Sequence, residues 1–154
     1  MLRGWLALAS VHLCFVCQLA AVPVGPNLCS PDIYTNIQTL INSSDLTLLD
    51  CKLYTPTVPD YKQQCPRSTM KCFAEEIKVL IFEWETIPQK GFSLNKKLNK
   101  IAARLNQTES KCHHCEFSRE ENAEEFLKGL RDAIQAMNAQ YCTQVQDQSK
   151  VSTV

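Results

Sequence analysis

The chain has 154 residues, with 16 basic and 16 acidic side chains and only 4 glycines. This balance of charge argues against a nucleic-acid-binding protein, which carries a basic face. The scarcity of glycine argues against a fold built on tight hairpins, so we expect an all-α domain with a single core.

The first segment has the pattern of a secretory signal peptide. Arg3 precedes an apolar run that ends in Ala20 and Ala21, which predicts cleavage near residue 21. The run, about fifteen residues long, is too short to span a membrane. We expect residues 22–154 to form one secreted, extracellular domain with a C-terminal tail that frays from about residue 144. Loss of Arg3 gives this domain a formal charge of −1.

The chain is rich in cysteine. Two of its 9 cysteines, Cys14 and Cys17, leave with the signal peptide. An oxidising compartment favours disulfide pairing of the others, and their odd number leaves at least one without a partner in the chain. The cysteines of the mature chain are Cys29, Cys51, Cys65, Cys72, Cys112, Cys115 and Cys142.

The first helix is predicted over residues 31–42. Pro31 suits the first helical position, and Ser30 suits the cap before it. The buried stripe consists of Ile33, Ile37, Leu40 and Ile41.

A long connection follows, over residues 45–64. Pro56 and Pro59 are interpreted as excluding a helix there, and residues 52–55 are candidates for a short extended segment. The connection is long enough to run the length of a helical bundle.

The second helix is predicted over residues 67–85. Ser68 or Thr69 is expected to cap it, with Pro66 outside. Its apolar residues recur at steps of three and four, which places them on one helical face. They are Met70, Phe73, Ile77, Leu80 and Trp84.

The second helix also has features away from this stripe. Val79 and Phe82 make it the most apolar helix of the chain, so we expect it to pack against several neighbours. Glu76 and Glu83 are two turns apart and share the face opposite the core, where carboxylates are usually solvated.

The third helix is predicted from Ser93, as its cap, to about Leu105. Cations late in a helix suit its dipole, so Lys100 and Arg104 require no partner. Its buried stripe is Leu94, Leu98, Ile101 and Leu105, and its outer face is basic at Lys96, Lys97, Lys100 and Arg104.

The last helix is predicted over residues 118–141. Its first part is acidic, which suits the positive end of the helix dipole. Its core side consists of Ala123, Phe126, Leu127, Leu130, Ala133, Ile134, Met137 and Tyr141.

The lengths of the connections predict the topology. A short link makes the second and third helices antiparallel, whereas the two long links permit parallel neighbours. The expected fold is therefore an up-up-down-down, short-chain four-helix bundle of the cytokine type.

This topology places the start of the first helix and the end of the last at the same pole. Cys29 and Cys142 lie at these two points, so we predict a disulfide between them, with Cys51–Cys142 as the alternative.

Two further motifs are short. Asn42 and Asn106 each begin an acceptor pattern for N-linked glycosylation. Cys112 and Cys115 form a Cys-x-x-Cys, but the strands of a redox enzyme and the second ligand pair of a zinc site are missing. With no paired nucleophile and base, the sequence predicts a protein that is not an enzyme and that needs no cofactor or metal.

Several segments of the chain occur in the same order, and at approximately the same spacing, as in one known protein family. The chain resembles the interleukin-15 family, including its interleukin-15-like branch. The resemblance implies two disulfides, Cys65–Cys112 and Cys72–Cys115, within a cytokine that regulates lymphocytes. The segments are Leu53-Tyr54-Thr55, Met70-Lys71-Cys72-Phe73, the run from Asn106 to Cys112, Cys115-Glu116 and Glu125-Phe126-Leu127.

The resemblance also implies three receptor chains and their contacts. These chains are a private α receptor with a sushi domain, a β chain and a common γ chain. The sequence departs from the family at Glu75, which replaces an apolar residue. The alternative from a different class is a saposin-like lipid-binding protein, which is also small, helical and cysteine-rich. The implied contacts are Tyr54, Glu76, Glu83 and Glu116 for the α receptor, Asp32 and Asn95 for the β chain, and Gln135 for the γ chain.

Overall fold

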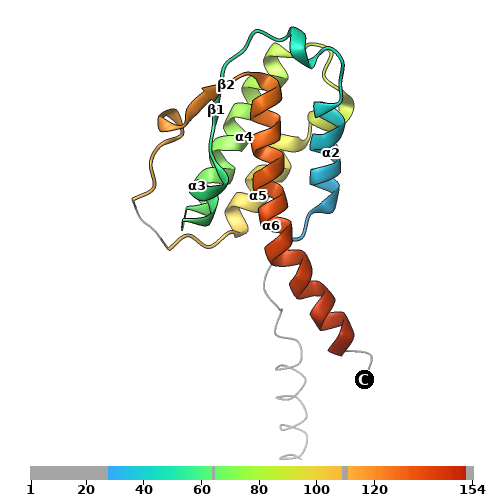
Figure 1. Ribbon diagram of the computed structural model, residues 1–154, viewed down its shortest axis with the longest axis vertical. Helices are drawn as coiled ribbons and strands as arrows, with labels where there is room; N and C mark the ends of the chain where they lie inside the picture. The colour runs from blue at the N-terminus through green and yellow to red at the C-terminus, as the bar shows by residue number, and fades with distance from the viewer. Residues whose placement is uncertain (1–27, 64, 109–110, 152–154) are drawn as a thin grey trace, which may run out of the picture.

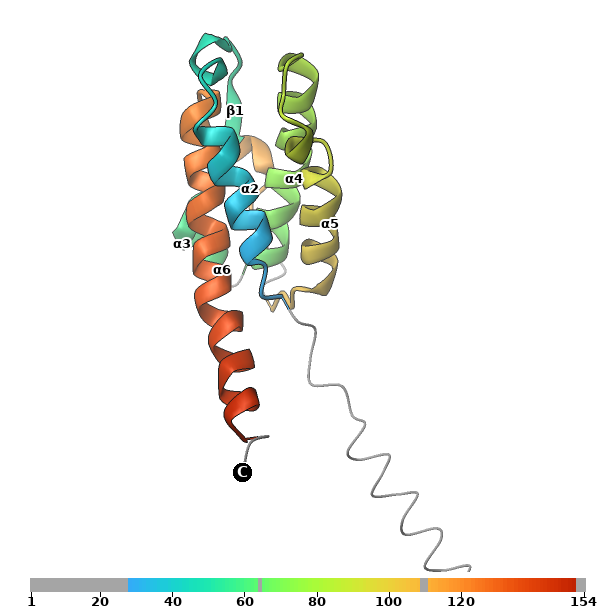
Figure 2. The ribbon, with the colours of Figure 1, turned by 90° about the vertical axis from the view of Figure 1, so that its right-hand side faces the viewer.

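The computed structural model describes residues 28–63, 65–108 and 111–151, and the predicted signal peptide lies outside them (Figure 1). Its main elements form a helical bundle, with α2 and α4 running in one direction and α5 and α6 in the other (Figures 1 and 2). The up-up-down-down prediction is confirmed. The elements are α2 (Pro31–Ile41), β1 (Leu53–Thr55), α3 (Val58–Lys62), α4 (Pro66–Glu83), α5 (Leu94–Arg104), β2 (Arg119–Glu121) and α6 (Ala123–Val151), with short 3-10 turns η1 (Leu46–Leu48), η2 (Gln89–Gly91) and η3 (Cys115–Phe117).

Two helix pairs enclose the core: α2 lies beside α6, and α4 lies beside α5 (Figure 2). The apolar stripes read from the sequence are buried except at Ile41 and Tyr141, which are partly buried against the core. The rings of Phe73 and Phe126 meet within it, with centroids 5.6 Å apart. Trp84 closes one end of the core, where its indole Nε1 donates a hydrogen bond to Asp45 Oδ2 at 3.0 Å. Burial of these side chains provides the main driving force for the fold.

The start of α4 differs from the prediction. Pro66 is the first residue of the helix rather than a residue before it, and Ser68 and Thr69 lie inside the first turn. Proline is tolerated there because the first N–H groups of a helix have no partner within the helix. The outer side of α4 also differs, since Phe82 is 82% exposed and lies mostly in solvent.

The prediction that the connection between the first two long helices excludes a helix was wrong. Pro59 occupies the first turn of α3, where proline fits. Thr57 Oγ1 accepts a hydrogen bond from the N–H of Asp60, and Asp60 Oδ2 accepts one from the N–H of Thr57 at 2.7 Å. This capping box stabilises a helix of only five residues.

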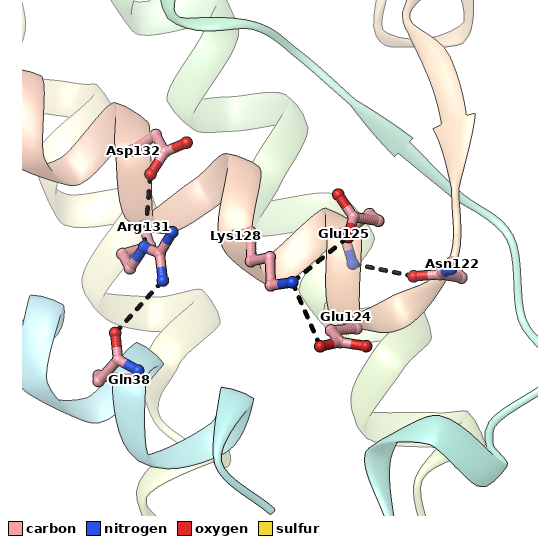
Figure 3. Close-up of polar contacts among 7 residues, drawn as sticks. All are labelled: Gln38, Asn122, Glu124, Glu125, Lys128, Arg131 and Asp132. Atoms are coloured by element: carbon pink, nitrogen blue, oxygen red, sulfur yellow. Dashed lines mark hydrogen bonds and ion pairs between the residues drawn. The ribbon is translucent and has the colours of Figure 1, made fainter.

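The last helix begins later and ends later than predicted. Residues 119–121 form β2, which pairs antiparallel with β1 through the register Tyr54↔Glu120. α6 then starts at Ala123, where Asn122 Oδ1 accepts a hydrogen bond from the N–H of Glu125 at 2.9 Å (Figure 3). The helix continues to Val151.

Disulfides hold the bundle at three places in the described chain. Cys65–Cys112 and Cys72–Cys115 tie α4 to the segment before α6, and Cys29–Cys142 joins the start of α2 to α6. These are the pairs expected from the resemblance and from the shared pole. Among the described cysteines, Cys51 is free.

Gly129 lies where α6 packs closely against β1. A Cβ atom built on Gly129 would lie 2.7 Å from Thr55 Cγ2, a buried methyl group. Replacing glycine by alanine inside a helix normally stabilises it by about 1 kcal/mol. Here we expect Gly129→Ala to destabilise the protein by about 1–3 kcal/mol in urea unfolding, because the new methyl group overpacks the contact.

The double variant Gly129→Ala/Thr55→Ser tests this cause, because serine lacks the methyl group that the new Cβ meets. It should recover most of the stability that Gly129→Ala loses. Equal losses in the single and double variants would show that the close contact is not responsible.

Candidate functional site

The candidate contacts for the α receptor lie where β1 crosses α4. The backbone N–H of Tyr54 donates a hydrogen bond to Glu76 Oε2 at 2.8 Å, so Glu76 joins the strand to the helix. Glu76 is half-buried, unlike the freely solvated carboxylate expected from the sequence. Its first role is therefore structural, because it satisfies a backbone donor that the sheet leaves unpaired.

The environment of Glu76 changes the pKa of its carboxyl group. Burial is the largest influence and raises the pKa of this carboxyl, the N–H of Tyr54 opposes it, and the charges of Glu120 and Glu75 add to the increase. The net result is a raised pKa, which comes mainly from burial and to a smaller extent from the two neighbouring carboxylates. Glu120 was missed in the sequence analysis because its place depends on the pairing of β2 with β1.

The other two candidates lie on the same side of the bundle. Glu83 is exposed two turns after Glu76, and its charge adds to the effect of burial in raising the pKa of Cys51, just before β1. Glu116 is exposed on η3, which the Cys72–Cys115 bridge fastens to α4. We name this surface the acidic face: Tyr54, Glu76, Glu83, Glu116 and Glu120.

The candidates for the β chain lie on α2 and α5. Asp32 is exposed at the start of α2, and its carboxylate is 3.8 Å from Lys97 Nζ on α5. Asn95 is half-buried, two residues before Lys97 and hence about 200° around the helix from it. The structure thus brings Lys97, which the sequence analysis did not select, next to Asp32.

The candidate for the γ chain, Gln135, is exposed on α6. One turn earlier, Arg131 Nη1 donates to Gln38 Oε1 on α2 at 3.4 Å, and its Nε donates to Asp132 at 3.3 Å (Figure 3). Lys128 interacts with Glu124 and Glu125, and the hydrogen bond that its ammonium group donates to Glu124 is the main reason that the pKa of Lys128 is raised. Over residues 31–41 and 123–142, the outer surface of α2 and α6 is thus polar, and the charges of Lys128 and Arg131 are paired inside the chain.

The remaining sequence motifs are at the surface. Asn42 and Asn106, the two glycosylation candidates, are both exposed. Cys112 and Cys115 belong to different bridges, so they do not form a redox pair with each other. In the described residues, no group of three or more His, Cys, Asp or Glu side chains is arranged to hold a metal ion.

The hydrogen bond between Glu76 and the N–H of Tyr54 leads to a stability prediction. Glu76→Ala removes the acceptor of the Tyr54 N–H and should reduce the free energy of unfolding by about 1–2 kcal/mol. Glu76→Gln keeps an acceptor and should be close to wild type. The control is Glu75→Ala, which removes a largely exposed ion pair with Lys78 and should cost less than about 0.5 kcal/mol in the same urea unfolding experiment.

The pH dependence of the protein's stability follows from the same carboxyl group. A pKa raised in the folded protein means that ionising Glu76 opposes folding above that pKa, whereas the protonated form carries no such penalty. Wild type should therefore gain stability relative to Glu76→Gln as the pH falls through the folded pKa toward the unfolded value. A difference between the two proteins that is constant from pH 7 to pH 4 would contradict this.

An up-up-down-down bundle tied by disulfides, with polar side chains on the outer sides of its helices, defines the class of short-chain helical cytokines. A family model described as Interleukin 15 matches residues 13–138 of this chain. The chain belongs to the interleukin-15 family, whose members are cytokines and not enzymes.

Individual relatives agree with this assignment. The interleukin-15 of Felis catus is 30% identical over 158 residues, which cover 87% of this chain and 94% of the relative. The match to interleukin-15 of Cavia porcellus is 30% over 110 residues (68% and 65%), and that to the Homo sapiens protein is 31% over 105 residues (64% and 60%). The last two matches thus span just under two thirds of those relatives' own length.

Family membership also decides between the alternatives from the sequence. A saposin-like lipid-binding protein is not supported, because the family match covers most of the chain. None of the helices in the described residues has the length and apolar character needed to cross a membrane.

Proposed function

We propose that this protein is a secreted cytokine that binds a sushi-domain α receptor through the acidic face and signals through a β chain and a common γ chain. The proposal is supported by the contacts among the elements that carry Tyr54, Glu76, Glu83 and Glu116. β1 lies against both α4 and η3, and Glu76 accepts a hydrogen bond from the Tyr54 N–H, in a bundle of this family. In the same proposal, Asp32 and Asn95 contact the β chain, Gln135 contacts the γ chain, and Asn42 and Asn106 carry glycans.

The physical basis of the α-receptor assignment is electrostatic. Several carboxylates on one surface attract a receptor with basic residues, which accelerates association and fixes the orientation of the complex. Tyr54 adds a rigid aromatic ring with a hydroxyl group, a side chain that often contributes strongly to binding energy. Its backbone is held in place by Glu76, so little conformational freedom remains to be lost on binding.

Co-precipitation is the direct test. The secreted protein is mixed with a soluble sushi-domain α receptor of the interleukin-15 type, and with an unrelated sushi domain as the control. Specific recovery with the first receptor supports the proposal. Failure to bind it at micromolar concentration would remove the α-receptor assignment.

Gln135 tests the γ-chain assignment separately. Gln135→Asp places a carboxylate on the exposed side of α6, where a contact with the γ chain would have to desolvate it. We expect cells bearing the receptor to need at least about tenfold more of the variant for the same signal. Affinity for the α receptor and helicity in circular dichroism should not change.

Gln89→Asp, an exposed glutamine on η2, is the matched control. It should leave signalling unchanged. Loss of helicity in Gln135→Asp, or an equal effect of the control, would show that Gln135 does not make the γ-chain contact.

A further inference from the structure

The outer side of α5 carries positive charge that the receptor assignments leave unused. The helix has four basic residues among its 11 and no acidic residue. Lys96, Lys100 and Arg104 are exposed and follow one another at intervals of four residues. This spacing places them along one side of the helix, over about 12 Å.

The stability of α5 explains only part of this charge. Arg104 is in the last turn, where a cation interacts favourably with the helix dipole. Lys96 is in the first turn, where a cation is unfavourable and where acidic residues are usual. α5 has no acidic residue in that turn, so its charge pattern is not the one that helix stability favours.

The surrounding elements do not neutralise these cations. Lys97 is the α5 residue with an acidic partner, Asp32. Throughout residues 28–63, 65–108 and 111–142, no carboxylate forms an ion pair with Lys96, Lys100 or Arg104. Their charges are available to a partner.

The neighbouring helix α4 extends the same surface. Arg67 Nε and Nη2 donate to the carbonyl oxygen of Leu105 at 3.1 and 2.9 Å, so the guanidinium lies at the C-terminal end of α5. Lys71, one turn further along α4, is also exposed. α4 and α5 lie side by side and antiparallel (Figures 1 and 2). We name this surface the basic face: Arg67, Lys71, Lys96, Lys100 and Arg104.

We propose that the basic face binds a sulfated glycosaminoglycan, a linear polysaccharide with sulfate groups repeated along its length. Lysines in a row match such a series of anions, because each ammonium group is a mobile point charge on a flexible stem. Without the predicted signal peptide the formal charge of the chain is −1, so the attraction is local to this face. α5 contains no aromatic residue, and hence lacks the side chains that stack on nucleic-acid bases or insert into a membrane interface.

Heparin is the probe in the test, which does not depend on the receptor assignments. The secreted, disulfide-bonded protein is freed enzymatically of N-linked glycans, since Asn106 is close to Arg104. Binding to immobilised heparin is measured by surface plasmon resonance at 0.15 M NaCl. Parallel surfaces carry chemically desulfated heparin and vesicles of phosphatidylcholine with phosphatidylserine.

Paired variants locate the binding site. Exposed ion pairs contribute modestly one by one, so Lys96→Gln/Lys100→Gln should weaken heparin binding about tenfold. Lys52→Gln/Lys62→Gln, which removes two exposed lysines elsewhere, should change it less than about twofold. Lys71→Gln/Arg104→Gln is a second variant of the basic face, and circular dichroism verifies that each protein is folded.

The proposal predicts binding to heparin that weakens as salt is added, with little binding to the desulfated polymer or to the vesicles. It is overturned if the wild type does not bind heparin at 0.15 M NaCl, or if the control and basic-face variants lose affinity equally. Equal binding to desulfated heparin, or equally strong binding to the anionic vesicles, would also overturn it.

Discussion

The double variant Cys29→Ser/Cys142→Ser should lose about 4 kcal/mol of unfolding free energy, the largest effect on stability that we expect. The two cysteines are 113 residues apart, but Cys65–Cys112 persists in the unfolded chain and shortens the path between them. The effective loop is about 66 residues, from Cys29 to Cys65 and from Cys112 to Cys142, and closing it restricts the unfolded state. Thermal unfolding should show a midpoint lower by roughly 8–30 °C.

Cys51→Ser is the matched control. It makes the same cysteine-to-serine change at a free cysteine. A difference in stability between it and the double variant therefore reports the loss of the bridge rather than the replacement of cysteine by serine. We expect it to change the unfolding free energy by less than about 1 kcal/mol, since Cys51 is only half-buried. A double variant as stable as the control would show that the bridge contributes little.

The largest expected effect on binding is at Glu83. Glu83→Lys reverses a charge in the acidic face, and a close contact of like charges should weaken α-receptor binding by a few kcal/mol, or roughly 30-fold or more. Glu83 is exposed and makes no hydrogen bond to another element among the described residues, so secretion and folding should be normal. Surface plasmon resonance against the sushi-domain receptor measures the change.

Two companion variants sharpen this test. Glu85→Lys makes the same change in net charge two residues away, and equal losses in both variants would show that the overall field, not a contact at Glu83, governs binding. Glu76→Lys should lose affinity and also stability, because it removes the acceptor that holds Tyr54. Unchanged affinity in Glu83→Lys would remove this residue from the α-receptor surface.

The parts of the fold that depend on periodicity were predictable from the sequence. The stripes of α2, α4, α5 and α6 are buried, apart from the partly buried Ile41 and Tyr141, because residues three and four apart share a helical face. The pairing of Cys29 with Cys142 followed from the direction of the helices, which the lengths of the connections indicate.

The parts of the fold that depend on short segments, or on contacts between residues far apart in the chain, were not predictable from the sequence. β2 is a polar segment of three residues, and it is a strand only because β1, some sixty residues earlier, lies beside it. α3 was missed because Pro59 was treated as a helix breaker, although it stands within a Thr57-x-x-Asp60 spacing that is a capping signal. The exposure of Phe82 also could not be read from composition, since it depends on which elements cover α4.

The candidate site was likewise predictable from the sequence only in part. The helical spacing of Glu76 and Glu83 places both on α4, but their different surroundings arise from β1, which covers only Glu76. Likewise, Lys97 meets Asp32 because of how α2 lies relative to α5, a relation that no local pattern contains.

The bridge between Cys29 and Cys142 has a consequence for survival among extracellular proteases. It converts the backbone between these residues into a covalent ring. A single cut anywhere in that ring, including the exposed connections between helices where proteases act most readily, leaves the two pieces joined through sulfur. Release of a fragment therefore requires a second cut or a reducing agent, and a nicked molecule retains every helix of the bundle in one covalent unit.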